Sequence, residues 1–122
     1  MSKSFNLAIM NNNFSEFQEL LKKSNARPGD LLRSAVYYQR PEMVRLLLQD
    51  PMVDPNLGAV LTMAVSHNMV NMVEMLLSHT QIDLTTLDED EETVLDLIEA
   101  NEADLDPKIV KMVRDKQNNK TE

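Results

Sequence analysis

Several residue types that commonly carry chemistry are absent or scarce in this chain of 122 residues. It has no cysteine, no tryptophan and only two glycines. The absence of cysteine excludes disulfides, thiol nucleophiles and thiolate zinc sites, and it favours a reducing environment, so we expect a cytoplasmic protein. With two glycines there is no G-x-x-x-x-G-K-[ST] loop to hold phosphates.

Basic residues are missing from the middle of the chain. No lysine or arginine lies between Arg45 and Lys108, a stretch with 14 acidic residues, and the formal net charge is −8. Residues 1–60 are almost neutral, so the deficit of cations belongs to the second half. Such a chain neutralises few phosphates, which disfavours nucleic acid and anionic membranes as partners and favours a protein with a basic surface.

Long hydrophobic runs are also missing. The apolar run near the N-terminus covers only Leu7 to Met10 and is followed by three asparagines, which is unlike a signal peptide. No run approaches the roughly 18 residues that a membrane span needs. A hydrophobic fraction of 43% is ample for one packed core, so we expect a soluble, single-domain protein.

Apolar residues recur at spacings of three and four in short segments, which come in pairs and are separated by Pro, Gly, Asn or Asp. Asp30 and Asp106 are suited to cap helices, and Pro41 and Pro107 to occupy first helical positions. Strand signals are weak. The pattern predicts an all-α fold with helices over residues 4–11, 14–23, 30–38, 41–49, 58–67, 70–79, 92–101 and 107–116.

The helix pairs are copies of one repeat. Residues 34–50 align with residues 63–79 without a gap, and residues 7–23 fit the same frame. The fourth pair fits when about three residues are inserted before Ile109. The aligned positions include Ala8, Ala35 and Ala64 in the first helices and Leu20, Leu21, Leu47, Leu48, Leu76 and Leu77 in the second. These apolar positions are expected to form one continuous core between stacked pairs.

The segment AVYYQRPEMVRLLLQDPMVDPN (residues 35–56) resembles the ankyrin repeat, with its alanine pair, short turn, leucine-rich second helix and D-x-N loop. DEDEETVLDL (residues 88–97) similarly resembles the family's D-x-x-G-x-T-P-L-H-L opening. Departures from the family are Asn12, Gln39 and Asn68 where a glycine separates the helices, and repeat spacings that are mostly shorter than about 33 residues.

The resemblance implies an ankyrin-like α-solenoid. We expect one domain over residues 1–116 and a disordered tail over 117–122. The short spacings predict stunted hairpin loops between the first three repeats. The four repeats are expected at about residues 4–29, 30–56, 57–85 and 86–116.

In the ankyrin frame the exposed ends of the first helices face a concave groove, which implies a row of residues that contact a partner. Tyr37 and Tyr38 occupy this row, and tyrosine is a frequent interface anchor. An alternative is that both rings pack on neighbouring repeats. The other residues expected to bind a partner on this row are Met10, Asn11, Ser66 and His67, with Arg33 and Arg40 beside the tyrosines.

The acidic run from Asp88 to Glu92 is the most prominent motif. As a calcium loop it has acidic residues at positions 1, 3, 5 and 12, but Thr93 replaces the glycine of position 6 and no helix precedes it. We favour a solvated loop tip that contacts a basic partner, with Asp88, Asp90 and Glu91 as partner-binding residues.

No pattern of catalytic or metal-binding residues accompanies this motif. His67 and His79 lie twelve residues apart without a metal-binding spacing, and no nucleophile motif is present. Of the nine methionines, Met43, Met63, Met72 and Met75 fall at core positions of the repeat, and Met10, Met52 and Met69 are left as surface candidates. We therefore expect no enzyme, no metal and no cofactor.

The sequence thus predicts a monomeric, non-catalytic protein–protein interaction module that binds through its concave groove and loop tips. The alternative is a small acidic inhibitor or a secreted effector, acting in a host cytosol, that blocks a basic surface on its target.

Overall fold

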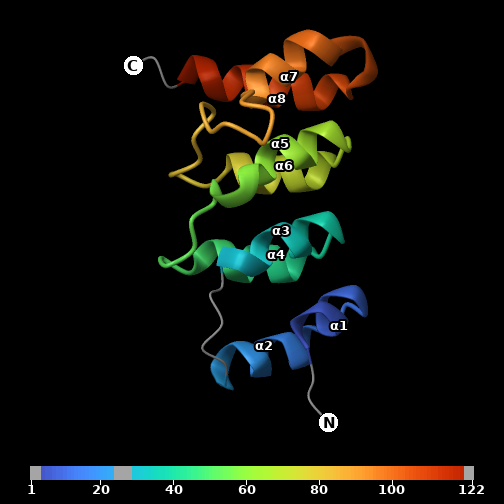
Figure 1. The fold of residues 1–122 in the computed structure, drawn as a ribbon, viewed down its shortest axis with the longest axis vertical. Helices are drawn as coiled ribbons and strands as arrows, with labels where there is room; N and C mark the ends of the chain where they lie inside the picture. The colour runs from blue at the N-terminus through green and yellow to red at the C-terminus, as the bar shows by residue number, and fades with distance from the viewer. Residues whose placement is uncertain (1–3, 24–28, 120–122) are drawn as a thin grey trace.

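The computed structural model describes residues 4–23 and 29–119, and helices dominate it (Figure 1). None of the described residues forms a strand. Eight α-helices and two short 3₁₀ turns follow one another along the described chain. They are α1 (Phe5–Met10), α2 (Phe14–Lys23), α3 (Gly29–Tyr37), α4 (Pro41–Gln49), η1 (Leu57–Ala59), α5 (Val60–Ser66), α6 (Val70–Leu77), α7 (Val94–Asn101), η2 (Glu102–Asp104) and α8 (Pro107–Asn119).

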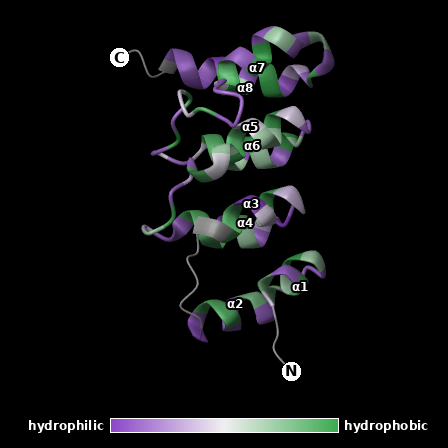
Figure 2. Cartoon of the chain, in the orientation of Figure 1, coloured by the Kyte–Doolittle hydropathy of each residue, from purple (hydrophilic) through white to green (hydrophobic). Residues whose placement is uncertain are grey.

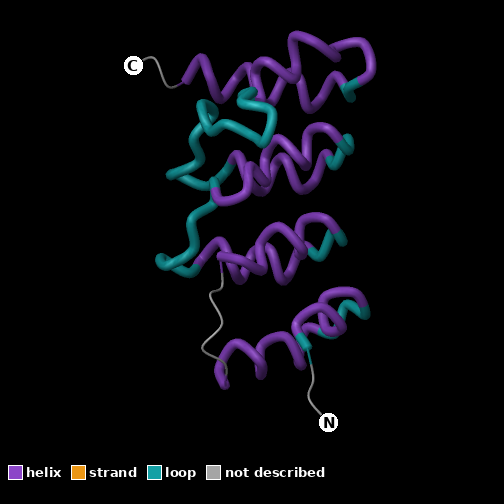
Figure 3. Tube along the Cα trace, in the orientation of Figure 1, coloured by secondary structure: helices purple, strands orange, loops and turns teal. Residues whose placement is uncertain are grey.

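The helices form two parallel rows, one helix of each pair in each row. Helices α1, α3, α5 and α7 contact one another in succession, and α2, α4, α6 and α8 do the same. Figure 3 shows the short turns within the pairs along one edge of the stack and the longer connections between pairs along the opposite edge. This arrangement confirms the predicted all-α solenoid of stacked helix pairs.

Local side-chain chemistry sets where several helices begin. Pro41 is the first residue of α4, where its missing N–H costs nothing. Ahead of α8, the Asp106 carboxylate accepts a hydrogen bond from the Lys108 N–H at 2.9 Å. Thr93 and Asp96 form a reciprocal capping box at the start of α7. Because Thr93 is the cap, α7 begins two residues later than the sequence pattern predicted.

Two further helix ends differ from the prediction. Helix α3 begins at Gly29, so Asp30, the predicted N-cap, is the second residue of the helix. Helix α8 continues to Asn119, so residues 117–119 belong to a helix and not to a tail, while residues 120–122 lie outside the described residues. Gln117 and Asn118 are exposed, as suits the end of a helix on the surface.

The predicted stunted loops have different outcomes. Residues 24–28, which hold most of the first loop, lie outside the described residues. In the second loop, the carboxylates of Asp50 and Asp54 each accept a hydrogen bond from the N–H two residues further on, at 2.9 Å. These two turns carry the chain between repeats without a strand in that loop.

The turn inside each of the first three pairs has one conformation. Asn12, Gln39 and Asn68 have φ angles of 54°, 56° and 57°, in the left-handed region. In each pair the N–H of the following residue donates to the carbonyl of the aligned alanine, Ala8, Ala35 or Ala64, at 2.8–2.9 Å. The turn therefore needs the backbone that glycine adopts most readily, and Gln39 is the least suited of the three to supply it.

The fourth pair replaces this turn with an insertion. The three extra residues inferred from the alignment form η2 between α7 and α8. Asn68 of the third repeat holds this insertion, since its amide donates to the Asp104 carbonyl at 3.2 Å and accepts from the Asp106 N–H at 2.8 Å. The backbone of Asn68 thus forms part of its own turn, while its side chain holds the next repeat.

The core runs through the stack at the predicted positions. Ala8, Ala35 and Ala64 are buried in the first row, and Leu47 and Leu76 in the second. Other predicted core leucines are only partly buried, among them Leu20, Leu21 and Leu48. Helix α8, at the opposite end from the N-terminus, is largely hydrophilic along its length (Figure 2), which suits a terminal repeat.

The prediction that Met10, Met52 and Met69 lie at the surface is confirmed for two of these three residues. Met52 is 83% exposed and Met10 is 48% exposed. Met69 is buried, because it follows the left-handed residue of its turn and packs in the core ahead of α6. None of the described helices is both long and apolar enough to cross a membrane.

Candidate functional site

A groove of about 740 Å³ lies between the third and fourth repeats. One side is formed by α5 and α7, and the other by the loop of residues 86–92. The structure brings five predicted partner-binding residues to this groove: Arg33, Ser66, His67, Asp88 and Asp90.

The helical side of the groove presents one face of α5. Thr62, Met63, Ser66 and His67 line it, spaced by three and four residues as neighbours on a helix face must be. The Ser66 hydroxyl donates to the Met63 carbonyl at 2.9 Å, within its own helix. Leu97 contributes a half-buried apolar surface from α7. The residues of α5 and α7 that line this side include no carboxylate, lysine or arginine.

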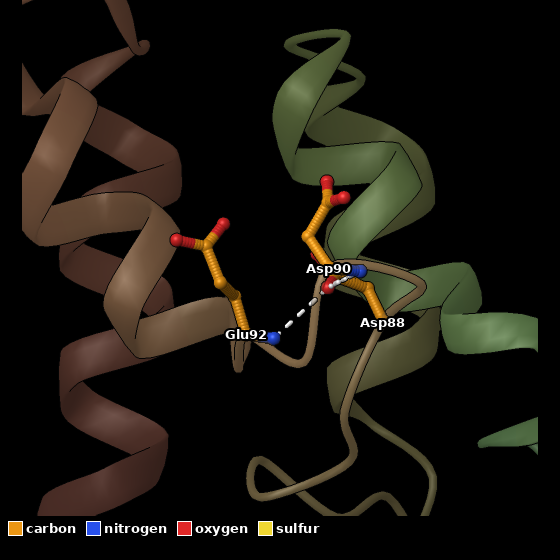
Figure 4. Close-up of side chains that lie close together, drawn as sticks. All are labelled: Asp88, Asp90 and Glu92. Carbon is orange, nitrogen blue, oxygen red and sulfur yellow. Dashed lines mark hydrogen bonds between the residues drawn. The ribbon is translucent and has the colours of Figure 1, made fainter.

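The loop side is an acidic turn closed by its own backbone. The Asp88 N–H donates to the Glu92 carbonyl at 2.9 Å, and the Glu91 N–H donates to the Asp88 carbonyl at 3.0 Å. Glu91 has a φ of 60° and stands where the family pattern places a glycine. The Asp88 carboxylate accepts from the N–H groups of Asp90 and Glu92 at 2.8 and 2.9 Å (Figure 4). Asp88 is therefore a residue that shapes the turn.

Asp90 and Glu92 are exposed acids of this turn that line the groove. Figure 4 shows their side chains projecting from the loop on the same side. Carboxylate oxygens of Asp88, Asp90 and Glu92 all lie within 4.8 Å of one another. Glu99, the twelfth residue of the calcium-loop pattern, does not belong to this group, and the Thr93 of position 6 caps α7. We assign no ion to the turn.

Both tyrosines of the predicted row are exposed, Tyr37 by 52% and Tyr38 by 38%. Exposure does not decide between this row and the alternative that both rings pack on neighbouring repeats, because Tyr37 also contacts His67 of the third repeat. The two rings meet edge to face with centroids 5.2 Å apart, and Tyr37 meets the His67 ring in the same way at 6.1 Å. The tyrosines do not line the groove, but His67 connects Tyr37 to it.

The two predicted arginines hold neighbouring repeats together. Arg40 donates from Nε to the Ile9 carbonyl at 2.7 Å and from Nη2 to the Met10 carbonyl at 2.6 Å. Arg33 donates from Nη1 to the Gly58 carbonyl at 2.6 Å. Arg33 lines the groove together with the acidic loop, whereas the tyrosines beside which it was expected do not line it.

The remaining predicted residues do not line the groove. Met10 and Asn11 are exposed at the end of α1, with Asn11 as its C-cap, and Glu91 is exposed on the loop. Sequence reasoning missed several residues that line the groove: Thr62, Met63, Leu87, Glu89, Glu92 and Leu97. The spacing of Thr62 and Met63 from Ser66 and His67 on one helix was a signal for two of them.

A second cavity of about 410 Å³ lies on the fourth repeat. Its charged side chains pair with one another, since Arg114 donates to Glu102 at 2.8 Å and Lys111 to Asp115 at 3.0 Å. The hydrogen bond and the charge of Glu102 raise the pKa of the exposed Arg114. Because these groups already satisfy one another, the first groove is the better candidate.

The family description for ankyrin repeats (three copies) matches residues 5–88, which is more than half of the chain. The chain belongs to the ankyrin repeat family. The match ends within the acidic turn, so the fourth helix pair of this ankyrin repeat protein lies outside it. Ankyrin repeats are generally protein–protein interaction modules and are typically not catalytic. No curated protein matches the chain.

Proposed function

We propose that this ankyrin repeat protein is a non-catalytic recognition module that binds a segment of another protein in the groove between the third and fourth repeats. The observation that carries the proposal is the groove of about 740 Å³, in which one face of α5 and the acidic loop enclose both polar and apolar side chains. Binding sites for small groups and side chains commonly have this size and mixed lining.

The surroundings of the groove support the proposal because they hold it open before a partner arrives. The loop is closed by its own hydrogen bonds, and α7 is fixed at its start by the capping box. Arg33 attaches α3 to the Gly58 carbonyl at the edge of the groove. A preformed site loses little conformational entropy on binding.

The tyrosines supply a second contact area next to the groove. Tyr37 touches His67, which is part of the groove, and Tyr38 packs against Tyr37. Exposed tyrosine rings bury a large area at a small entropic cost, which is why they are common anchors at interfaces. A partner segment that leaves the groove past His67 therefore meets these two rings.

A partner segment that occupies this groove is also shielded from other proteins. A scaffolding role and an inhibitory role are therefore two uses of the same contact, and both place the partner on the first row of helices.

The proposal is tested by selecting binders from a random library of 12-residue peptides displayed on phage. The selected peptides are then measured against Ser66→Trp and Ser78→Trp. Ser66 and Ser78 are matched, because both are exposed at helix ends and both donate their hydroxyl to the carbonyl three residues earlier. Only Ser66 lines the groove, so a tryptophan fills the groove in one variant and not in the other.

We expect peptides that bind the wild type and Ser78→Trp alike but bind Ser66→Trp at least about tenfold more weakly. Far-ultraviolet circular dichroism checks that both variants remain folded. If no selected peptide distinguishes the two variants, the groove is not the binding site.

A further inference from the structure

The groove has a net negative charge, which lies along one side only. Asp90 and Glu92 are exposed, Glu89 lies beside them, and all three line the groove. The helical side contributes Thr62, Met63 and Ser66 and no carboxylate. A partner therefore meets anionic groups along the loop and neutral groups along α5.

Cations of the protein itself neutralise only part of this side. The sequence has no lysine or arginine between Arg45 and Lys108. Arg33 is the one arginine among the described residues that line the groove, and its single charge faces several carboxylates of the loop. The ion pairs found in the described residues lie on the fourth repeat, at Lys111 and Arg114, away from the groove. The positive charge that complements this loop must come from a partner.

Apolar surface lies next to the acidic residues. Leu87 precedes the turn and is 56% exposed, and Leu97 is half-buried on α7. Both line the same groove as Asp90 and Glu92. An anionic group beside an apolar contact fits a long cationic side chain together with an apolar neighbour, because lysine and arginine carry their charge on a hydrocarbon stem.

We propose that the groove takes a peptide segment in which a lysine or arginine reaches the Asp90 and Glu92 carboxylates while a neighbouring apolar side chain contacts Leu87 and Leu97. This inference rests on the proposed function and adds to it the chemistry of the partner. Asp88 supports these two residues, because its Oδ1 accepts from the N–H groups of both Asp90 and Glu92.

The test uses peptides from the 12-residue library that discriminate Ser66→Trp from Ser78→Trp, selected at about 0.15 M salt so that distant charges are screened. Each peptide is synthesised as selected and with every lysine and arginine replaced by glutamine. Binding is measured by fluorescence anisotropy to the wild type and to Asp90→Asn with Glu92→Gln. The matched control is Glu42→Gln with Glu74→Gln, which removes the same charge from exposed residues of α4 and α6 that do not line the groove.

We expect these peptides to be rich in lysine or arginine. The glutamine version, and the Asp90→Asn, Glu92→Gln protein, should each weaken binding at least about tenfold, and the control should change it by less than about twofold. Groove-binding peptides that lack cations, or an equal effect of the control variant, would overturn this inference and leave the proposed function standing. Peptides that never distinguish Ser66→Trp from Ser78→Trp would overturn both.

Discussion

Aspartate residues shape the loops of this protein through one local hydrogen bond. In each case the carboxylate accepts from the N–H two residues further on, at 2.8–2.9 Å, a bond that closes a tight turn. Part of the net charge of −8 is therefore explained by loop structure and not by binding. The aspartates that make this bond are Asp50, Asp54, Asp83, Asp88 and Asp106.

Gln39 has a left-handed backbone conformation that its residue type does not favour. Its φ of 56° is costly for a residue with a side chain, by about 1–2 kcal/mol, while glycine adopts it freely but loses more entropy on folding. We expect Gln39→Gly to raise the free energy of unfolding by about 0.5–1 kcal/mol. Urea denaturation followed by circular dichroism measures this change.

Asn68→Gly is the matched control, since Asn68 has a φ of 57°. Its side chain also makes two hydrogen bonds to the fourth repeat, which glycine would remove. We expect this variant to lose about 1 kcal/mol. If Gln39→Gly were no more stable than the wild type, the strain assigned to Gln39 would be absent.

At the scale of elements, side chains that bond to the backbone of another repeat add to the apolar core. Arg33 bonds to Gly58, and Asn56 donates to the Gln81 carbonyl at 3.0 Å and accepts from the Asp83 N–H at 2.8 Å. These bonds join residues 25–27 positions apart, close to one repeat length. These hydrogen bonds therefore fix how one helix pair is oriented on the next, in addition to the apolar contacts between them.

Arg40 holds the first repeat on the second through two hydrogen bonds. It is half-buried and bonds to the last carbonyls of α1. We expect Arg40→Met to lower the stability of α1 by about 1.5–3 kcal/mol, because bonds from a charged donor are lost while the apolar stem is kept. Amide hydrogen exchange of α1 should become at least about tenfold faster.

Arg45→Met serves as the comparison for this prediction, because Arg45 is an exposed residue of the same helix, α4. It should leave exchange in α1 almost unchanged. Equal exchange in both variants would show that the Arg40 bonds do not stabilise the first repeat.

The order and type of the helices followed from the sequence, because the apolar period and the aligned alanines and leucines repeat in each pair. The exact ends did not follow where a cap competes with the period. Thr93 delays α7, while α8 extends past Lys116 through residues that have no breaker among them. Cross-repeat bonds such as that of Arg40 depend on side-chain direction across a stack, which linear spacing does not contain.

At the scale of the whole molecule, the uneven distribution of charge along the sequence places the acidic loop on one side of the groove. The sequence placed the tyrosines and arginines at one end and the carboxylates at the other. In the stack, Arg33 and the acidic loop share one groove, and Tyr37 is joined to it through His67. Five of the predicted site residues meet there because the acidic loop folds back over α5, which a repeat alignment alone does not show.

The tyrosines should contribute to binding of segments that extend beyond the groove. We expect Tyr37→Ala with Tyr38→Ala to weaken the binding of a groove-selected 12-residue peptide by about 2 kcal/mol, because two exposed rings that are available as anchors are lost. Isothermal titration calorimetry measures the change. Unchanged affinity in a folded double variant would remove the tyrosines from the binding surface.

The most direct test of the central claim is to map where a groove-selected peptide binds, by nuclear magnetic resonance of the ¹⁵N-labelled protein. We expect the largest amide shift changes in α5, in residues 86–92 and in the first half of α7, which enclose the groove. The amides of α4 and α6, in the other row, should change little. Changes that are largest on α4 and α6 would contradict the assignment of the groove as the binding site of this protein.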